Sequence, residues 1–141
     1  MRRQHDAAVE LVGEIVGRSA QIESAEDAYR LSVQLAKLTG LLRIHFVQED
    51  RTLYPYMVAS SNVAASETAR AFSAEMGGLS QAFEAFAQKW TSSTAILADP
   101  AGFRRESTAV FAALGDRIER ENEQLYPLAD GIGHHEVRRT A

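Results

Sequence analysis

The sequence contains no cysteine, only three prolines and no long run of uncharged apolar residues. Without cysteine the chain can form neither a disulfide bond nor a thiolate-bound metal or iron–sulfur site, so His, Asp or Glu would have to hold any metal. Every apolar run is shorter than the roughly 18 residues that a membrane span requires. The N-terminus also lacks the apolar core of a signal peptide, and we therefore expect a cytoplasmic protein.

The composition is that of a globular domain. The chain has 141 residues, 45% of them hydrophobic and 24% charged, and two domains would leave too few residues for either core. The 15 basic and 19 acidic residues give a net charge of −4, and the basic residues are spread along the chain. We therefore expect neither nucleic acid nor a membrane surface as a main partner.

Four segments repeat their apolar residues with the helical period of about 3.6 residues, and no segment combines strand-like alternation with hairpin-turn residues. The chain is therefore predicted to be all-α. The predicted helices run from about Arg3 to Ile22, from an N-cap within Ser24–Asp27 to about Ala59, from the break at Ser60–Asn62 to about Trp90, and from Asp99-Pro100 to about Leu128.

Short connections force neighbouring helices to run antiparallel, so these segments predict an up-down-up-down four-helix bundle. The bundle is expected to occupy residues 1–130. Gly131 and Gly133 are expected to stop the last helix, and residues 131–141 to form a short polar tail.

The chain also carries an internal repeat. A shift of 72 positions, from Glu49 to Glu121, superimposes the Leu-Tyr-Pro triplets that end at Pro55 and Pro127. The two halves therefore resemble related helical hairpins. Because proline removes one intrahelical hydrogen bond, each of these prolines is expected to bend or end its helix.

Ionisable residues follow the apolar stripes of three helices. The stripes comprise Val9, Val12 and Val16 in the first helix, Leu31, Leu35, Leu38 and Leu42 in the second, Phe72, Met76, Leu79 and Phe83 in the third, and Val110 and Leu114 in the fourth. Continuing the first, second and fourth stripes leads to His5, His45, Glu49, Arg117 and Glu121. An unpaired charge is costly in a bundle interior, so these side chains must compensate one another or bind something.

A His and a Glu four positions apart, as at His45 and Glu49, lie on one face of a helix and can bind one ion. A second carboxylate, Glu121, occupies the repeat-related position, and His5 is expected at the same level of the first helix. Helix-borne His and Glu that converge inside a four-helix bundle are typical ligands of non-haem iron and manganese.

On these residues, the chain resembles the hemerythrin-like (HHE cation-binding) domains over nearly its whole length. The matching features are an early His, a His-x-x-x-Glu followed by Leu-Tyr-Pro, and a later Glu followed by Leu-Tyr-Pro. The resemblance implies a four-helix bundle that holds two irons bridged by two carboxylates. It also implies binding of oxygen or nitric oxide, storage or sensing of iron, or repair of iron centres. By position, His5, His45, Glu49 and Glu121 match the family's ligands.

Two positions depart from that pattern. Met76 stands where the third helix should supply a His, and Arg117 stands where a second His-x-x-x-Glu should begin. Both missing imidazoles would have served the same iron. A thioether is a poor ligand for hard iron, and a guanidinium cannot ligate because it is always protonated. We therefore do not expect a two-iron centre.

Arg117 should reach Glu121, one helical turn on, and Glu49 across the bundle, so we hypothesise that its charge substitutes for one metal. Two interpretations stay open. In the first, one divalent ion, Fe or alternatively Zn or Mn, binds His5, His45, Glu49 and Glu121. In the second, no metal binds, and Arg117 forms a closed ion-pair network with the same four residues.

The first interpretation predicts a protein that binds at most one metal ion or small ligand in a sensing, ligand-binding or storage role. The second predicts a structural or regulatory protein that interacts with a partner. No catalytic residue is visible outside the metal set, so we do not expect an enzyme, and oxidative chemistry at a single Fe(II) is a third interpretation. Met76 is expected to be ordinary core. Tyr54 and Tyr126 could place their hydroxyls near the site, but packing at the helix ends before the prolines is the favoured expectation, and Val33 and Val47 offer a possible homodimer face.

Overall fold

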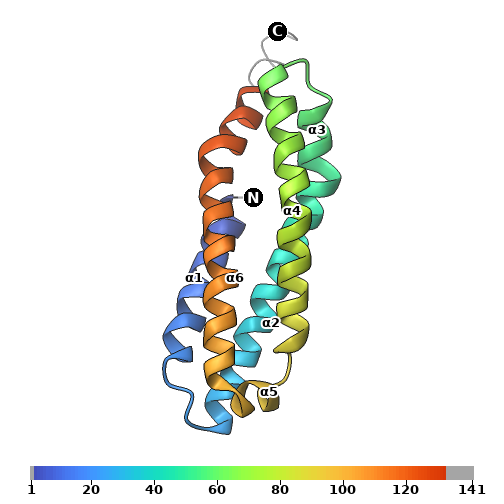
Figure 1. Cartoon of the computed structure of the whole chain (residues 1–141). Helices are drawn as coiled ribbons and strands as arrows, with labels where there is room; N and C mark the ends of the chain where they lie inside the picture. The colour runs from blue at the N-terminus through green and yellow to red at the C-terminus, as the bar shows by residue number, and fades with distance from the viewer. Residues whose placement is uncertain (1, 133–141) are drawn as a thin grey trace.

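The structure is a computed structural model, which describes residues 2–132 (Figure 1). Four helical columns make up the fold. They are α1 (Arg2–Ser19); α2 (Ala25–Gln48), continued by the π-helical turn η1 (Glu49–Leu53) and by α3 (Tyr54–Val58); α4 (Val63–Lys89); and α6 (Pro100–Arg120), continued by the π-helical turn η2 (Glu121–Leu125) and helical residues 126–132. α1 packs on α2 and α6, and α4 packs on the same two helices, which closes the ring. The predicted all-α four-helix bundle is confirmed.

Polar side chains begin three of these helices as the sequence predicts. Ser24 and Asp27 form a reciprocal capping box at the start of α2, with both hydrogen bonds at 3.2 Å. Asn62 accepts a hydrogen bond from the third residue of α4, and Asp99 caps α6 just before Pro100. These caps satisfy backbone N–H groups that would otherwise lack partners.

A short helix, α5 (Ser93–Ala98), was missed by the sequence analysis. It lies in the connection between α4 and α6, where the polar run after Trp90 predicts only a break. Ser92 in that run is its N-cap and accepts a hydrogen bond from the backbone N–H of Ala95. Burial of Ile96 anchors this single short helix against the core.

The two repeat-related prolines do not end their helices. Pro55 and Pro127 each follow a π-helical turn, in which Tyr54 and Tyr126 donate backbone N–H groups to the carbonyls five residues earlier. The wider turn changes the hydrogen-bond register where proline lacks a donor, so the helical column continues past it. Each π-helical turn begins at one of the two repeat-related glutamates.

The apolar stripe predicted for the first helix is wrong. Val9 and Val16 are 56% and 50% exposed, because the face that α1 buries is a neighbouring one. The buried members of that face are His5, Ala8, Ile15 and Ser19. With half-buried Val12 they follow the alternating three-and-four spacing of a bundle seam, so His5 is buried although the predicted stripe is not.

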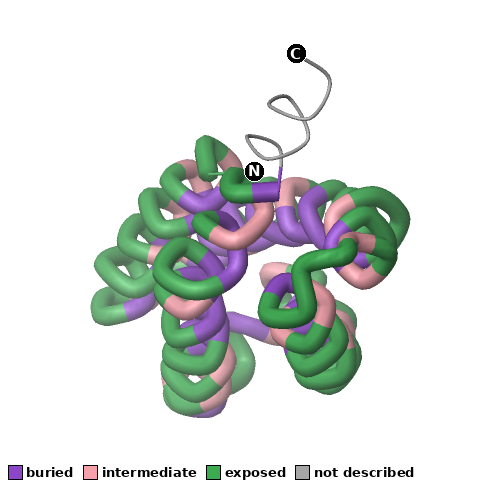
Figure 2. The backbone as a smooth tube through the Cα atoms, turned by 90° about the horizontal axis from the view of Figure 1, so that it is seen from above, coloured by how far each residue is buried: buried purple, intermediate pink, exposed green. Residues whose placement is uncertain are grey.

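The interior contains two apolar clusters with the polar residues between them. The larger cluster includes the leucines of α2, with Met76, Phe83 and Phe103, and it confirms Met76 as core. The smaller includes Met57, Phe72 and Leu125. Viewed along the bundle, buried segments line the inside of the ring (Figure 2).

The last column is helical through residue 132, beyond the stop predicted at Gly131, and Ile132 is buried in the smaller cluster. The rest of the predicted tail lies outside the described residues. None of the helices within residues 2–132 combines the length and the apolar character that a membrane crossing would take.

Candidate metal centre

The structure brings His5, His45, Glu49 and Glu121 together between the two apolar clusters. They come from α1, α2, η1 and η2, and one nitrogen or oxygen from each lies within 4.8 Å of the others. All four residues are at most 2% exposed. The sequence therefore placed these residues at one level of the bundle correctly.

The two imidazoles point the same ring atom inward. Their Nε2 atoms are 3.0 Å apart, and His5 Nε2 lies 2.8 Å from Glu121 Oε2 while His45 Nε2 lies 2.6 Å from Glu49 Oε1. Two nitrogens and two carboxylate oxygens thus face one point. Nitrogen and oxygen donors in this combination suit Fe, Mn or Zn.

Amide side chains orient both imidazoles. His5 Nδ1 lies 3.0 Å from Asn122 Oδ1, and His45 Nδ1 lies 2.6 Å from Gln4 Oε1. An amide oxygen only accepts, so each Nδ1 carries the proton and donates it outward. Gln48 Oε1 accepts from Gln4 Nε2 and holds that amide in place. Metal-bound histidines have this arrangement, in which an outer acceptor fixes the ring and the second nitrogen faces the metal.

Each carboxylate has one oxygen on either side of the cluster. Glu49 Oε1 and Glu121 Oε2 face the imidazoles, whereas their other oxygens face Arg117 and Tyr54. Arg117 Nε lies 3.3 Å from Glu121 Oε1, and the Tyr54 hydroxyl donates to Glu49 Oε2 at 2.9 Å. The two glutamates therefore join a histidine side to an arginine side.

Arg117 is 4% exposed and fully paired on the arginine side. It donates to Glu121, to Glu75 Oε2 at 3.0 Å, to the Tyr54 hydroxyl at 3.3 Å and to the backbone carbonyl of Phe72. The predicted direct pairing with Glu49 is wrong. The Tyr54 hydroxyl instead bridges Arg117 and Glu49, because it accepts a hydrogen bond from Arg117 and donates one to Glu49.

The two tyrosines were expected to pack at helix ends, and both instead place their hydroxyls in the cluster. The Tyr126 hydroxyl lies 3.0 Å from His5 Nε2 and 3.5 Å from His45 Nε2, and it faces Glu49 Oε1 and Glu121 Oε2 at 3.4 and 3.2 Å. Glu75 was likewise not predicted as part of the site. The repeated Glu-x-x-x-x-Tyr spacing was the available signal for the tyrosines.

Burial and pairing shift the protonation of this cluster. Burial alone would lower the pKa of His45, but hydrogen bonds and charge interactions with Glu121 and Glu49 raise the pKa to about 9. Burial raises the pKa of Glu49. Burial also opposes ionisation of Glu121, yet hydrogen bonds from His45 and His5 hold its pKa below the usual range. A metal-free cluster thus retains a proton on His45 near neutral pH.

Burial and the two glutamates raise the pKa of both Tyr54 and Tyr126. In the metal-free protein both phenols are therefore neutral and can donate a hydrogen bond. The cluster as a whole can bind a cation, hold a proton and donate hydrogen bonds, all within a space shielded from water.

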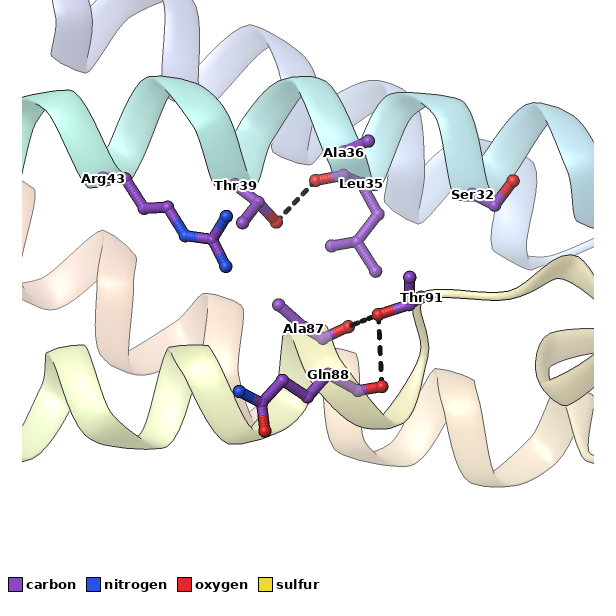
Figure 3. Close-up of a pocket in the computed structure, with 8 residues that line it drawn as sticks. All are labelled: Ser32, Leu35, Ala36, Thr39, Arg43, Ala87, Gln88 and Thr91. Atoms are coloured by element: carbon purple, nitrogen blue, oxygen red, sulfur yellow. Dashed lines mark hydrogen bonds between the residues drawn. The ribbon is translucent and has the colours of Figure 1, made fainter.

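A cavity of about 190 Å³ between α2 and α4 lies away from this cluster (Figure 3). Three of its polar side chains already have partners within the protein. The Thr39 hydroxyl donates to Leu35 O, the Thr91 hydroxyl to Ala87 O, and Arg43 pairs with Glu84. This cavity therefore offers no convergent set of free polar groups comparable to the buried cluster.

The fold and this site define a helical bundle with buried side chains suited to a cation. The family model described as the hemerythrin HHE cation-binding domain matches residues 1–129. The chain therefore belongs to the hemerythrin HHE cation-binding family. No curated protein and no solved structure matches it.

Proposed function

We propose that the protein binds one divalent metal ion at His5, His45, Glu49 and Glu121. The role that this site serves is sensing, ligand binding or storage rather than catalysis. The proposal goes beyond the family's general property of cation binding, because it commits to one ion and to the histidine side of the cluster. Iron is the proposed metal, with Zn or Mn as alternatives, since a nitrogen and oxygen donor set accepts all three.

The pair of inward-facing Nε2 atoms is the observation that carries this proposal. Both rings keep their Nδ1 proton for an outer amide oxygen, so both Nε2 atoms present lone pairs unless an extra proton is taken up. Without that extra proton, two lone pairs 3.0 Å apart repel each other, and the adjacent carboxylate oxygens add to the negative potential. A metal cation removes this repulsion for all four groups at once.

The arginine side supports one ion rather than two. Arg117 faces the carboxylate oxygen of Glu121 that is turned away from the imidazoles, where its guanidinium supplies a fixed positive charge. Met76 is buried in the larger apolar cluster and offers only a soft thioether. We propose that Arg117 takes the electrostatic role of a second cation, and that no ion binds on its side.

Bound iron would supply Lewis-acid and one-electron chemistry at a site shielded from water. The residues around it have separate tasks. Gln4 and Asn122 orient the imidazoles, and the glutamates neutralise the ion's charge. The Arg117 network fixes the outer carboxylate oxygens, so that the inner oxygens stay directed at the imidazoles.

Metal content tests the proposal directly. Protein purified without chelator and reconstituted with ferrous, manganous or zinc ions should retain close to one equivalent of metal in elemental analysis. His45→Gln should reduce this to near zero, whereas Met76→Leu, on the helix that supplies no ligand, should leave it unchanged. With free metal at about 100 times its Kd, binding should raise the free energy of unfolding by about 2.7 kcal/mol, and EDTA should abolish that gain.

The metal-free network is the second candidate, and one observation favours it. A proton on His45, with Arg117 and two carboxylates, makes a charge-balanced cluster without any metal. This candidate predicts no retained metal, a melting temperature indifferent to EDTA, and a role as an interaction or regulatory protein. Reconstituted protein without metal would overturn the metal-binding proposal in favour of this one.

A further inference from the structure

The Tyr126 hydroxyl lies against all four proposed His and Glu ligands. Its hydroxyl oxygen lies between 3.0 and 3.5 Å from the inward-facing atom of each of the four proposed ligands. The four atoms themselves extend up to 4.8 Å from one another. The phenol oxygen therefore caps the quartet from one side instead of lying beside a single member.

We propose that Tyr126 is a fifth metal ligand, bound through its phenolate oxygen. This inference rests on the proposed function, since it requires the ion at the quartet. It changes the character of the site, because a phenolate is a hard anionic oxygen donor and favours the ferric state of iron over the ferrous state and over Zn.

The distances are those of ligands sharing one ion. Two donors at about 2.1 Å from a metal and at right angles to each other are roughly 3 Å apart. Tyr126 satisfies that spacing toward His5 and Glu121, at 3.0 and 3.2 Å, and is only slightly farther from Glu49 and His45. An ion held by the quartet is thus close to this oxygen without movement of the helix.

The repeat provides an internal comparison. Tyr54 and Tyr126 each follow their glutamate by five residues across a π-helical turn, and each hydroxyl contacts that glutamate. Tyr54 otherwise faces the guanidinium of Arg117, whereas Tyr126 faces two imidazoles. Only Tyr126 therefore has a metal-binding environment.

Charge balance also favours a phenolate. Glu49, Glu121 and Arg117 carry two negative charges and one positive charge inside the bundle. A divalent ion leaves this buried group with one excess positive charge, which an anionic Tyr126 removes. Buried charges are tolerated best when they are compensated.

Tyr126 also lies close to the protein surface. It lines a surface cavity of about 390 Å³ together with Arg2, Arg3, Leu53, Ala129 and Asp130. The Arg2 guanidinium lies 5.4 Å from the centre of the Tyr126 ring. On ligation the O–H bond would break, the oxygen would bind the metal, and the proton would pass to solvent water.

Visible spectroscopy of the iron-loaded protein tests the inference. Protein is loaded with ferrous iron under argon and oxidised with ferricyanide, which takes one electron from each iron. We expect a visible tyrosinate-to-iron(III) charge-transfer band, and resonance Raman excitation in that band should enhance phenolate modes that shift when ring-deuterated tyrosine is incorporated. Tyr126→Phe should retain iron but lose the band. Tyr29→Phe, at an exposed tyrosine far from the cluster in the sequence, should retain the band.

Elemental analysis of the same samples separates the two proposals. Wild-type protein that binds iron without a phenolate band overturns the role of Tyr126 and leaves metal binding intact, as does a band that persists in Tyr126→Phe. Protein that binds no metal overturns both. If the retained metal is zinc, the ultraviolet difference spectrum of tyrosinate formation replaces the visible band, and its absence overturns the inference.

Discussion

The histidine side and the arginine side of the cluster share the same local backbone structure but face different groups. On both sides a glutamate begins a π-helical turn and a tyrosine five residues later directs its hydroxyl inward. On the arginine side the facing cation is covalently part of the chain, namely Arg117. On the histidine side two imidazoles face the carboxylates, and their charge depends on a proton or a metal.

This difference lets the arginine side compensate its buried carboxylates without a metal ion. Two carboxylates buried without a cation would be strongly destabilising. Arg117 supplies permanent compensation, and its hydrogen bonds to Glu75 and to the Phe72 carbonyl anchor it to α4. The histidine side can then remain open to exchange. The compensating charge is therefore fixed on the arginine side, whereas on the histidine side it depends on a proton or on the proposed metal.

Removal of Arg117 should have the largest effect on the stability of the protein. Arg117→Ala strips Glu121 of its permanent partner and removes the hydrogen bonds of the guanidinium to the Phe72 carbonyl and the Tyr54 hydroxyl. We expect the free energy of unfolding of the metal-free protein to fall by about 3–5 kcal/mol, the usual cost of an uncompensated buried charge. Urea denaturation monitored by circular dichroism measures this loss.

Arg120→Ala is the matched control. Arg120 pairs with the same glutamate, Glu75, at 2.8 Å, but its side chain is 36% exposed. Exposed ion pairs contribute only about 0–1 kcal/mol, so this variant should unfold almost as the wild type does. Equal losses in the two variants would show that Arg117 does not compensate the buried carboxylates.

Alkaline pH should weaken the histidine side alone. The folded-state pKa of His45 is raised from 6.5 to about 9, so its contribution to stability is complete below pH 6.5 and is lost as the pH rises through 9. For the metal-free protein we expect a loss on the order of 3 kcal/mol between pH 6 and pH 10. Denaturation curves across this range measure it.

His45→Gln should remove most of this pH dependence of the free energy of unfolding, because the titrating imidazole is absent. The metal-loaded protein should also be less sensitive, since a metal ligand must be the neutral imidazole and metal replaces the proton. If the free energy of unfolding depends on pH equally in the wild type and in His45→Gln, the stabilising proton is bound by another group.

The sequence predicted the histidine side well because the leucine stripe of α2 runs without interruption into His45 and Glu49. It predicted the wrong face for α1, where Val9, Val12 and Val16 also follow a helical period. Periodicity alone cannot distinguish two neighbouring apolar faces. The buried face was decided by packing against α2 and α6, which no single helix reveals.

The tyrosines were missed for a geometric reason. Five residues advance an α-helix by about 500°, or roughly 140° past a full turn, which places Tyr126 away from the face of Glu121. The π-helical turn widens the helix and returns the hydroxyl to the glutamate. Glu75 was missed because its side chain is 49% exposed, so that in the sequence it resembles any solvated acidic residue.

The smallest expected effect concerns α4, which supplies Glu75 and the Phe72 carbonyl to the arginine side but none of the four proposed ligands. Gly77 and Gly78 lie on its exposed face, and an added Cβ at either position meets nothing within 4 Å. Gly77→Ala should therefore stabilise the protein by about 0.5–1 kcal/mol through helix propensity. Thermal denaturation should show this gain while the metal content stays at the wild-type value, because the substitution touches neither side of the cluster. A loss of bound metal on Gly77→Ala would instead mean that the histidine side depends on the flexibility of α4, and the two sides would not be separable as described.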